Sequence, residues 1–214
     1  MKLRENVLDH IRVRPSLFFR VMPFRRRYHD LLVSNDTQLV IEGFPRCANT
    51  YAVAAVKTSQ PVPLKLARHT HAFAQLQRAH DLNIPTLLLI RNPEDAILSY
   101  VIREQYVDVP LAIKRYIDFH ERVLPLTERF VISDFETTIT DFGSVIAALN
   151  SRYKIALSPF DDGKKSQGAI RAEVERMEHV HTGGVVSELK VARPSEERQA
   201  IKKQLKSSLA GHRS

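Results

Sequence analysis

The chain has 214 residues, of which 43% are hydrophobic and 26% charged, and this composition is typical of one folded domain or two small ones. Seven glycines and eleven prolines exclude collagen and low-complexity chains. Cys47 is the only cysteine, which excludes an internal disulfide and a thiolate metal site and favours a reducing compartment. No apolar stretch approaches the roughly 20 residues of a membrane span, and the N-terminus lacks the apolar segment of a secretory signal, so we expect a cytoplasmic protein without a transmembrane segment.

The formal net charge of +8 is concentrated at the two ends of the chain. Residues 1–30 contain eight basic and three acidic side chains, residues 164–214 contain eleven and six, and residues 31–163 carry a net charge of −2. Such basic ends favour an anionic partner, which could be a phosphorylated cofactor, an acidic substrate, lipid headgroups or nucleic acid. The sequence contains no RNA-binding motif, so we expect no specific nucleic-acid partner.

Residues 1–35 are predicted to form a basic N-terminal arm, and residues 36–214 a single α/β domain. In residues 1–30 arginines are mixed with large apolar side chains, and Pro15 and Pro23 interrupt any long amphipathic helix. One interpretation is a helical arm that packs on the body of the protein with its arginines in water. The alternative is an arm that makes peripheral contact with a membrane or a partner.

From residue 38 onward, short apolar runs alternate with longer helical patterns, which is typical of βα units. The predicted strands cover residues 38–43, 64–68, 86–91 and 130–133. The predicted helices cover residues 50–58, 71–82, 94–103, 111–126, 141–152, 169–179 and 195–209. This order predicts a three-layer α/β fold, with a mostly parallel sheet flanked by helices. Ligands of such sheets bind beyond the carboxyl ends of the strands, here in loops 43–50, 69–72, 91–99 and 134–141.

The first of these loops, G-F-P-R-C-A-N-T over residues 43–50, keeps the length and register of the G-x-x-x-x-G-K-[ST] phosphate loop. Ala48 replaces the second glycine, and Asn49 replaces the lysine. Backbone N–H groups at the start of the following helix can still hold an anion, and the guanidinium of Arg46 can grip an oxyanion with two hydrogen bonds. Ala48 is expected to strain the loop if its position requires a positive φ.

Residues 45–51, namely Pro45, Arg46, Cys47, Ala48, Asn49, Thr50 and Tyr51, resemble the P-[KR]-S-G-T-T-[WY] loop of sulfotransferases that use 3′-phosphoadenosine 5′-phosphosulfate (PAPS). In that family, which has a P-loop NTPase-like fold, the loop holds the 5′-phosphosulfate. The segment from Arg91 to Tyr100 resembles the family's R-[ND]-P-x-D-x-x-x-S element, whose arginine and serine bind the 3′-phosphate. The resemblance therefore implies that Arg91 and Ser99 bind this phosphate.

Two further segments resemble the family less closely. His69-Thr70-His71 is similar to a K-[ST]-H segment, which implies that His71 is the general base and that His69 stands in place of a lysine. Residues 163–168 faintly resemble an R-K-G-x-x-G loop, so Lys164 and Lys165 are expected in a basic loop that contacts an anion. The resemblance covers residues 38–157 well and the ends of the chain poorly.

The resemblance implies a sulfotransferase that moves a sulfuryl group from PAPS to a hydroxyl of a carbohydrate, lipid or small metabolite and releases 3′-phosphoadenosine 5′-phosphate (PAP), without a metal. Arg46 and His71 would be catalytic, and Asn49 and Thr50 would help the loop amides to hold the phosphosulfate. Two alternatives stay open. One is a P-loop nucleotide kinase or NTPase with Asp134 as a magnesium ligand. The other is a catalytically impaired module that binds anions through its basic ends.

Overall fold

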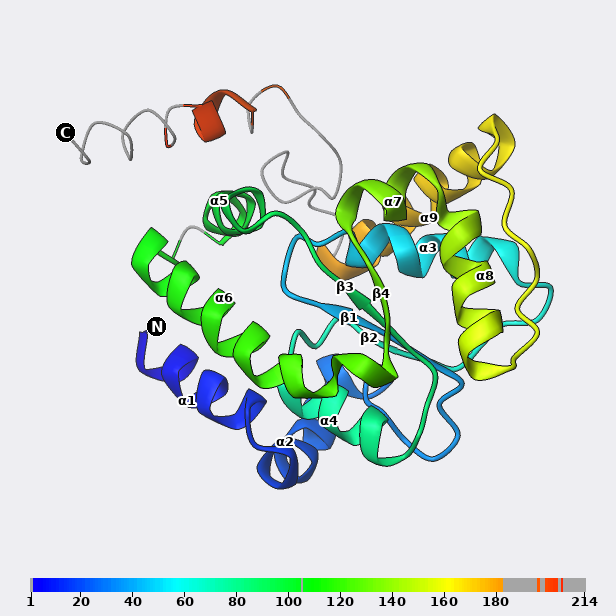
Figure 1. Ribbon diagram of the computed structural model, residues 1–214. Helices are drawn as coiled ribbons and strands as arrows, with labels where there is room; N and C mark the ends of the chain where they lie inside the picture. The colour runs from blue at the N-terminus through cyan, green and yellow to red at the C-terminus, as the bar shows by residue number, and fades with distance from the viewer. Residues whose placement is uncertain (1, 105, 183–195, 197–198, 204, 206–214) are drawn as a thin grey trace.

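A four-stranded parallel sheet lies at the centre of the protein in the computed structural model, which describes residues 2–104, 106–182, 196, 199–203 and 205 (Figure 1). The spatial order of the strands is β2-β1-β3-β4. Their bounds are Leu39–Gly43 for β1, Leu66–Arg68 for β2, Thr86–Leu89 for β3 and Val131–Ser133 for β4. Every residue of β1 is buried, as expected for a central strand covered on both faces. The predicted parallel sheet is therefore confirmed.

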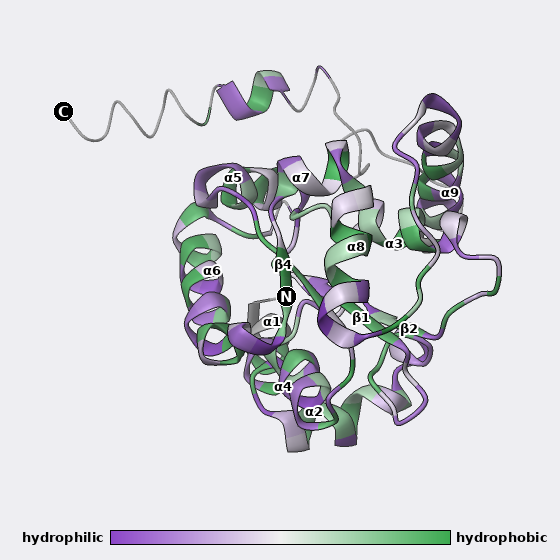
Figure 2. Cartoon of the chain, turned by 45° about the vertical axis from the view of Figure 1, so that its right-hand side comes forward, coloured by the Kyte–Doolittle hydropathy of each residue, from purple (hydrophilic) through white to green (hydrophobic). Residues whose placement is uncertain are grey.

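Helices cover both faces of this sheet (Figure 1). The contacts of the strands place α3 and α8 on one face and α4 on the other, with α9 packed on α3 and with α6 against α4 and α5. Figure 2 shows the strands as mainly hydrophobic and the helices as a mixture of hydrophobic and hydrophilic residues. The bounds are Asn49–Ser59 for α3, Phe73–Asp81 for α4, Pro93–Arg103 for α5, Val109–Val123 for α6, Phe142–Tyr153 for α8 and Lys164–Thr182 for α9.

Three predicted segments differ from the structure. Residues 134–141, expected as a loop, contain helix α7 (Phe135–Thr140), whose first turn is capped by Asp134. The helix predicted to continue to residue 126 ends at Val123 and passes into the 3-10 helix η3 (Leu124–Arg129), because Pro125 has no N–H to continue an α-helix. Lys164 and Lys165 lie in the first turn of α9 and not in a loop. The predicted helix 195–209 lies largely outside the described residues.

The N-terminal arm consists of α1 (Lys2–Arg12), α2 (Pro15–Val21) and the 3-10 helices η1 (Met22–Phe24) and η2 (Arg26–Tyr28). Phe18, Met22 and Tyr28 are buried in one cluster with Ala72 and Ala74, at the start of α4. The arm therefore packs on the body of the protein, which agrees with the first of the two interpretations. Within the described part of the chain, no helix combines the length and the apolar character needed to cross a membrane.

The order of the strands creates a crevice at the carboxyl end of the sheet. The chain runs from β1 to β2 on one side and then crosses to β3 on the other side of β1. Loops that leave β1 and β3 therefore diverge, and ligands of open α/β sheets bind at such a point. Gly43 is the last residue of β1. A larger residue is excluded here, because a Cβ at this position would lie 2.3 Å from the carbonyl oxygen of Leu89.

Candidate functional site

A cleft of about 2650 Å³ opens beyond the carboxyl ends of the strands. This volume is well above the roughly 300–1,000 Å³ of a typical small-ligand pocket, so the cleft has room for a nucleotide and a second substrate. Its lining comes from the loops after β1, β2 and β3, from the N-terminal arm and from α5, α6 and α9. The described residues that line it include sixteen lysines and arginines and five aspartates and glutamates, so the cleft favours anionic ligands.

The loop after β1 has alternating backbone handedness. Arg46 has a φ of 74° and Ala48 a φ of 66°, whereas the φ of Cys47 between them is not positive. Such an alternation turns consecutive N–H groups to one side and forms an anion-binding nest. Asn49 then begins α3, whose first N–H groups have no partner within the helix. The position of Ala48 thus requires a left-handed conformation, which confirms the expected strain at the lost glycine.

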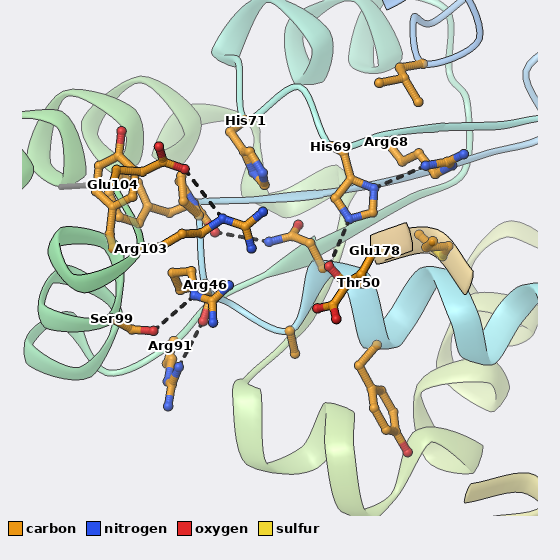
Figure 3. A pocket seen from close by; sticks show the side chains of 18 of the residues that line it. Arg46, Thr50, Arg68, His69, His71, Arg91, Ser99, Arg103, Glu104 and Glu178 are labelled. Atoms are coloured by element: carbon orange, nitrogen blue, oxygen red, sulfur yellow. Dashed lines mark hydrogen bonds and ion pairs between the residues drawn. The ribbon is translucent and has the colours of Figure 1, made fainter. Parts of the chain in front are cut away.

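Arg46, Arg91 and Ser99 meet at one wall of the cleft although they come from three elements (Figure 3). Arg46 Nε donates to Ser99 Oγ of α5 at 3.0 Å. Arg91, which follows β3, donates through Nη1 to the carbonyl oxygen of Arg46 at 3.0 Å. The structure therefore brings the phosphate-loop arginine and the two residues of the second motif together.

Two further contacts hold Arg91 in place, one on its guanidinium and one on its backbone. It lies over the ring of Phe135 at 3.7 Å from the centroid, in the range of a cation–π interaction. The backbone carbonyl of Arg91 accepts from the hydroxyl of Tyr116 at 3.2 Å. Arg91 Nε is buried, and no partner for it exists among the described residues.

Three side chains of the phosphate-loop segment and the start of α3 make contacts within the protein. The Cys47 side chain is fully buried in the core, and burial raises the pKa of its thiol to about 12, so it stays protonated. The Asn49 amide donates to the carbonyl of Phe44 at 3.1 Å and is 4% exposed, so it stabilises the loop itself. The Tyr51 hydroxyl accepts from Gln167 of α9 at 2.9 Å. Cys47 can therefore offer an anion only its backbone, whereas Asn49 and Tyr51 line the cleft.

His71 lies at the cleft and is held by its other ring nitrogen. Its Nδ1 is 2.8 Å from the carbonyl oxygen of Gly43, which can only accept, so Nδ1 carries the proton and Nε2 is the basic atom. The side chain is 27% exposed. Burial lowers the pKa of His71 to about 4, and the hydrogen bond to Gly43 opposes this shift. His71 is therefore neutral at pH 7, the state that a general base requires.

Glu42 is a buried carboxyl group that the sequence interpretation missed. Its side chain is 0% exposed in β1, where it accepts from Thr70 N and Thr70 Oγ1 at 2.8 Å and from His71 N at 3.0 Å. His69 and His71 both have positive φ values, 57° and 51°, so this loop is a second nest and Glu42 occupies it. An acidic residue inside the apolar run L-V-I-E-G was the available signal, because such a group needs buried donors.

His69 is part of a chain of side chains along the cleft. Arg68 Nη1 lies 3.3 Å from His69 Nδ1 and must donate to it, since a guanidinium has no acceptor. His69 Nε2 therefore carries the proton and donates to Thr50 Oγ1 at 3.3 Å. Thr50 and His69 are thus linked across the loops that follow β1 and β2. Of the two lysines expected to contact an anion, Lys164 lines the cleft and Lys165 is absent from its lining.

Asp134, the candidate magnesium ligand, caps helix α7 by accepting from Thr137 N at 2.7 Å. Among the described residues, no group of three or more His, Cys, Asp or Glu side chains is placed to hold a metal ion. The arrangement can bind an anion at the wall formed by Arg46 and Arg91 and can accept a proton at His71. A scan of the sequence against models of protein families gives no match, and a search of curated proteins gives none either.

Proposed function

We propose that the protein is a PAPS-dependent sulfotransferase with a P-loop type nucleotide site. The observation that carries the proposal is the meeting of Arg46, Arg91 and Ser99 at hydrogen-bond distance. A nucleotide with anionic groups at both its 5′ and 3′ ends needs two neighbouring anion sites, and this wall offers one from the loop after β1 and one from β3 and α5. The sequence resemblance assigns the same residues to those two roles.

The residues fit such a nucleotide in their chemistry. The nest at residues 46–48 and the start of α3 supply N–H donors for the phosphosulfate end. Arg91 and Ser99, which both line the cleft, suit the 3′-phosphate through a guanidinium and a hydroxyl. PAPS would supply the sulfuryl group, which leaves the bridging phosphate oxygen and becomes bonded to the oxygen of the acceptor.

The chain's own groups would then serve the transfer. Arg46 stabilises the negative charge that develops on the leaving phosphate, because a preorganised cation in a partly closed cleft is worth more than one in water. His71 Nε2 takes the proton of the acceptor hydroxyl, and Nδ1 stays fixed on Gly43. The hydrogen bonds from Thr70 and His71 to Glu42 of β1 fix the histidine loop beside the strand that leads into the phosphate loop.

A non-catalytic PAP-binding protein is the second candidate, and two observations favour it. Ala48 keeps the loop in a strained left-handed conformation, and a base with a pKa of about 4 accepts protons weakly at neutral pH. The kinase or NTPase alternative is less favoured, because Asn49 replaces the phosphate-binding lysine and Asp134 already serves as a helix cap.

Transfer of radiolabelled sulfate from PAPS to a panel of hydroxylated carbohydrates, lipids and small metabolites tests the proposal. We expect labelled product with at least one acceptor and loss of that product in Arg46→Ala. Tight binding of PAP without transfer to any acceptor would establish the second candidate. Failure to bind PAP would overturn both.

A further inference from the structure

The N-terminal arm contributes part of the lining of the cleft that also contains the residues proposed to hold the nucleotide. Arg12 of α1 and Arg27 of η2 line the cleft together with His71 and with Arg103 of α5. Figure 3 shows Arg103 reaching toward the space between His71 and Arg46. The basic arm, whose role the nucleotide site does not explain, is thus part of the same cavity.

These arginines act on His71 electrostatically. After burial, which is the largest cause, the charges of Arg12, Arg103 and Arg27 each lower the pKa of His71, against the hydrogen bond from the ring to Gly43. Like charges oppose protonation only when they are close and poorly screened. The three arginines thus share the cleft with His71 and oppose its protonation.

Among the described residues of this wall, arginines outnumber acidic side chains. Asp9 accepts from Arg12 at 3.1 Å and pairs with Arg115 at 2.6 Å, and Glu104 lies 3.4 Å from Arg103. Arg27 lies 5.8 Å from the ring centroid of Tyr28 and is exposed. Among the described residues, four guanidinium groups accompany two carboxylates in this part of the wall.

The arm holds these charges on a fixed support. Tyr28, next to Arg27, is buried in the cluster that contains Ala72, the residue that follows His71. Leu31 accepts from Arg68 N at 3.0 Å, which ties the end of the arm to β2. An ordered cation loses less entropy on binding than a flexible one, so this wall is preorganised for an anion.

We propose that Arg12, Arg27 and Arg103 bind an anionic group of the acceptor, so that the acceptor is a hydroxylated molecule with a carboxylate, sulfate or phosphate beside the hydroxyl that faces His71. The inference rests on the proposed function. The anions of the nucleotide belong to the wall of Arg46, Arg91 and Ser99, and the anionic group of the acceptor would be bound by the different arginines that line the cleft with His71.

The test uses three probes that share one sugar ring and one aglycone: phenyl glucoside, phenyl glucuronide and phenyl glucoside 6-sulfate. Binding of each is measured by calorimetry to the full chain saturated with PAP, at low ionic strength. We expect the two charged probes to bind about tenfold more tightly than the neutral one, as for one charge-assisted contact. Comparison of the two charged probes shows whether a carboxylate or a sulfate is the preferred group.

Variants then locate the preference. Arg27→Gln and Arg103→Gln should each reduce the charged-to-neutral ratio several-fold, and PAP affinity should stay unchanged in Arg27→Gln. Arg20→Gln is the matched control, because Arg20 is an exposed arginine of the same arm that does not line the cleft. Equal binding of the three probes, no binding of either charged probe, or an equal loss in Arg20→Gln would overturn the inference. Loss of PAP binding in the unmodified protein would instead count against the proposed function.

Discussion

Arg91 donates a hydrogen bond from Nη1 to the carbonyl oxygen of Arg46 at 3.0 Å, so the end of β3 holds the loop that follows β1. The side chain of Arg46 is in turn bonded to Ser99. These contacts join residues separated by 45 and 53 positions in the chain into one wall. Changes in either arginine are therefore expected to affect nucleotide chemistry, in different ways.

Arg46→Ala is expected to lower the turnover number by about 10²–10³-fold, the usual effect of removing one donor that stabilises developing charge. The Michaelis constant for PAPS should change less, because the nest of backbone N–H groups stays. Arg46→Lys keeps the charge but not the planar pair of donors, so its turnover number should lie between those of the unmodified protein and Arg46→Ala. Steady-state kinetics of the three proteins measure this split, and an unchanged turnover number in Arg46→Ala would remove Arg46 from the reaction.

His71→Gln is expected to lower the turnover number by about 10²–10⁴-fold, since it removes the general base. Burial lowers the pKa of His71 to about 4, so the activity of the unmodified protein should rise with pH through about 4 and then stay level. His69→Gln is the control. Both ring nitrogens of His69 are engaged, one with Arg68 and one with Thr50, and His69 is not the proposed base. The same acidic limb persisting in His71→Gln would assign it to another group.

Ala48→Gly is expected to stabilise the fold by about 1 kcal/mol. The left-handed conformation at φ 66° costs an alanine roughly 1–2 kcal/mol, and the greater freedom of glycine in the unfolded chain offsets part of the gain. Ala172→Gly, in an exposed turn of α9, is the same substitution in a right-handed helix and should destabilise by about 1 kcal/mol. Chemical denaturation of both variants measures the free energies of unfolding. Destabilisation by both would show that Ala48 is not strained.

Glu42→Gln tests the carboxyl group beneath the histidine loop. Burial raises the pKa of Glu42 to about 7 from 4.5, against the hydrogen bonds from Thr70 and His71. Between these two pH values the folded state binds more protons than the unfolded state, so the stabilising contribution of Glu42 is complete below pH 4.5 and is lost as the pH rises through about 7. The shift corresponds to about 3 kcal/mol.

His71 has the opposite dependence, since its lowered pKa gives a contribution that is complete above pH 6.5 and is lost as the pH falls through about 4. Both the unmodified protein and Glu42→Gln contain His71, so its effect largely cancels in their difference. Unfolding free energies measured from pH 4.5 to 7 should show the unmodified protein losing stability relative to Glu42→Gln. A constant difference over this range would mean that the folded pKa of Glu42 is not raised.

The sequence predicted the order and type of the central elements because their period and their boundaries are local properties. The apolar run before Gly43 and the Asn92-Pro93 boundary define β1 and α5 without reference to the rest of the chain. Helix α7 was missed because its six residues are too few for a visible helical period, and its cap at Asp134 was interpreted as a metal ligand.

The candidate site was predictable in part. Arg46, Arg91 and Ser99 came from motif spacing, and the topology of the sheet brings them together. The wall made by Arg12, Arg27 and Arg103 was not predictable, since the position of the arm depends on the packing of Phe18 and Tyr28 against α4. Glu42 could have been found from its charge in a buried strand, but its partners are 28 and 29 residues away in the chain.

The most direct test of the nucleotide site is calorimetric titration of the purified protein with PAP and, separately, with ATP and magnesium. We predict tighter binding of PAP, because Arg91 and Ser99 should contact its 3′-phosphate, and a tenfold to hundredfold loss of PAP affinity in Arg91→Gln, roughly the effect of one hydrogen bond between charged groups. Tighter binding of magnesium-ATP, or PAP affinity unchanged in Arg91→Gln, would contradict the assignment of this wall to a nucleotide with a 3′-phosphate.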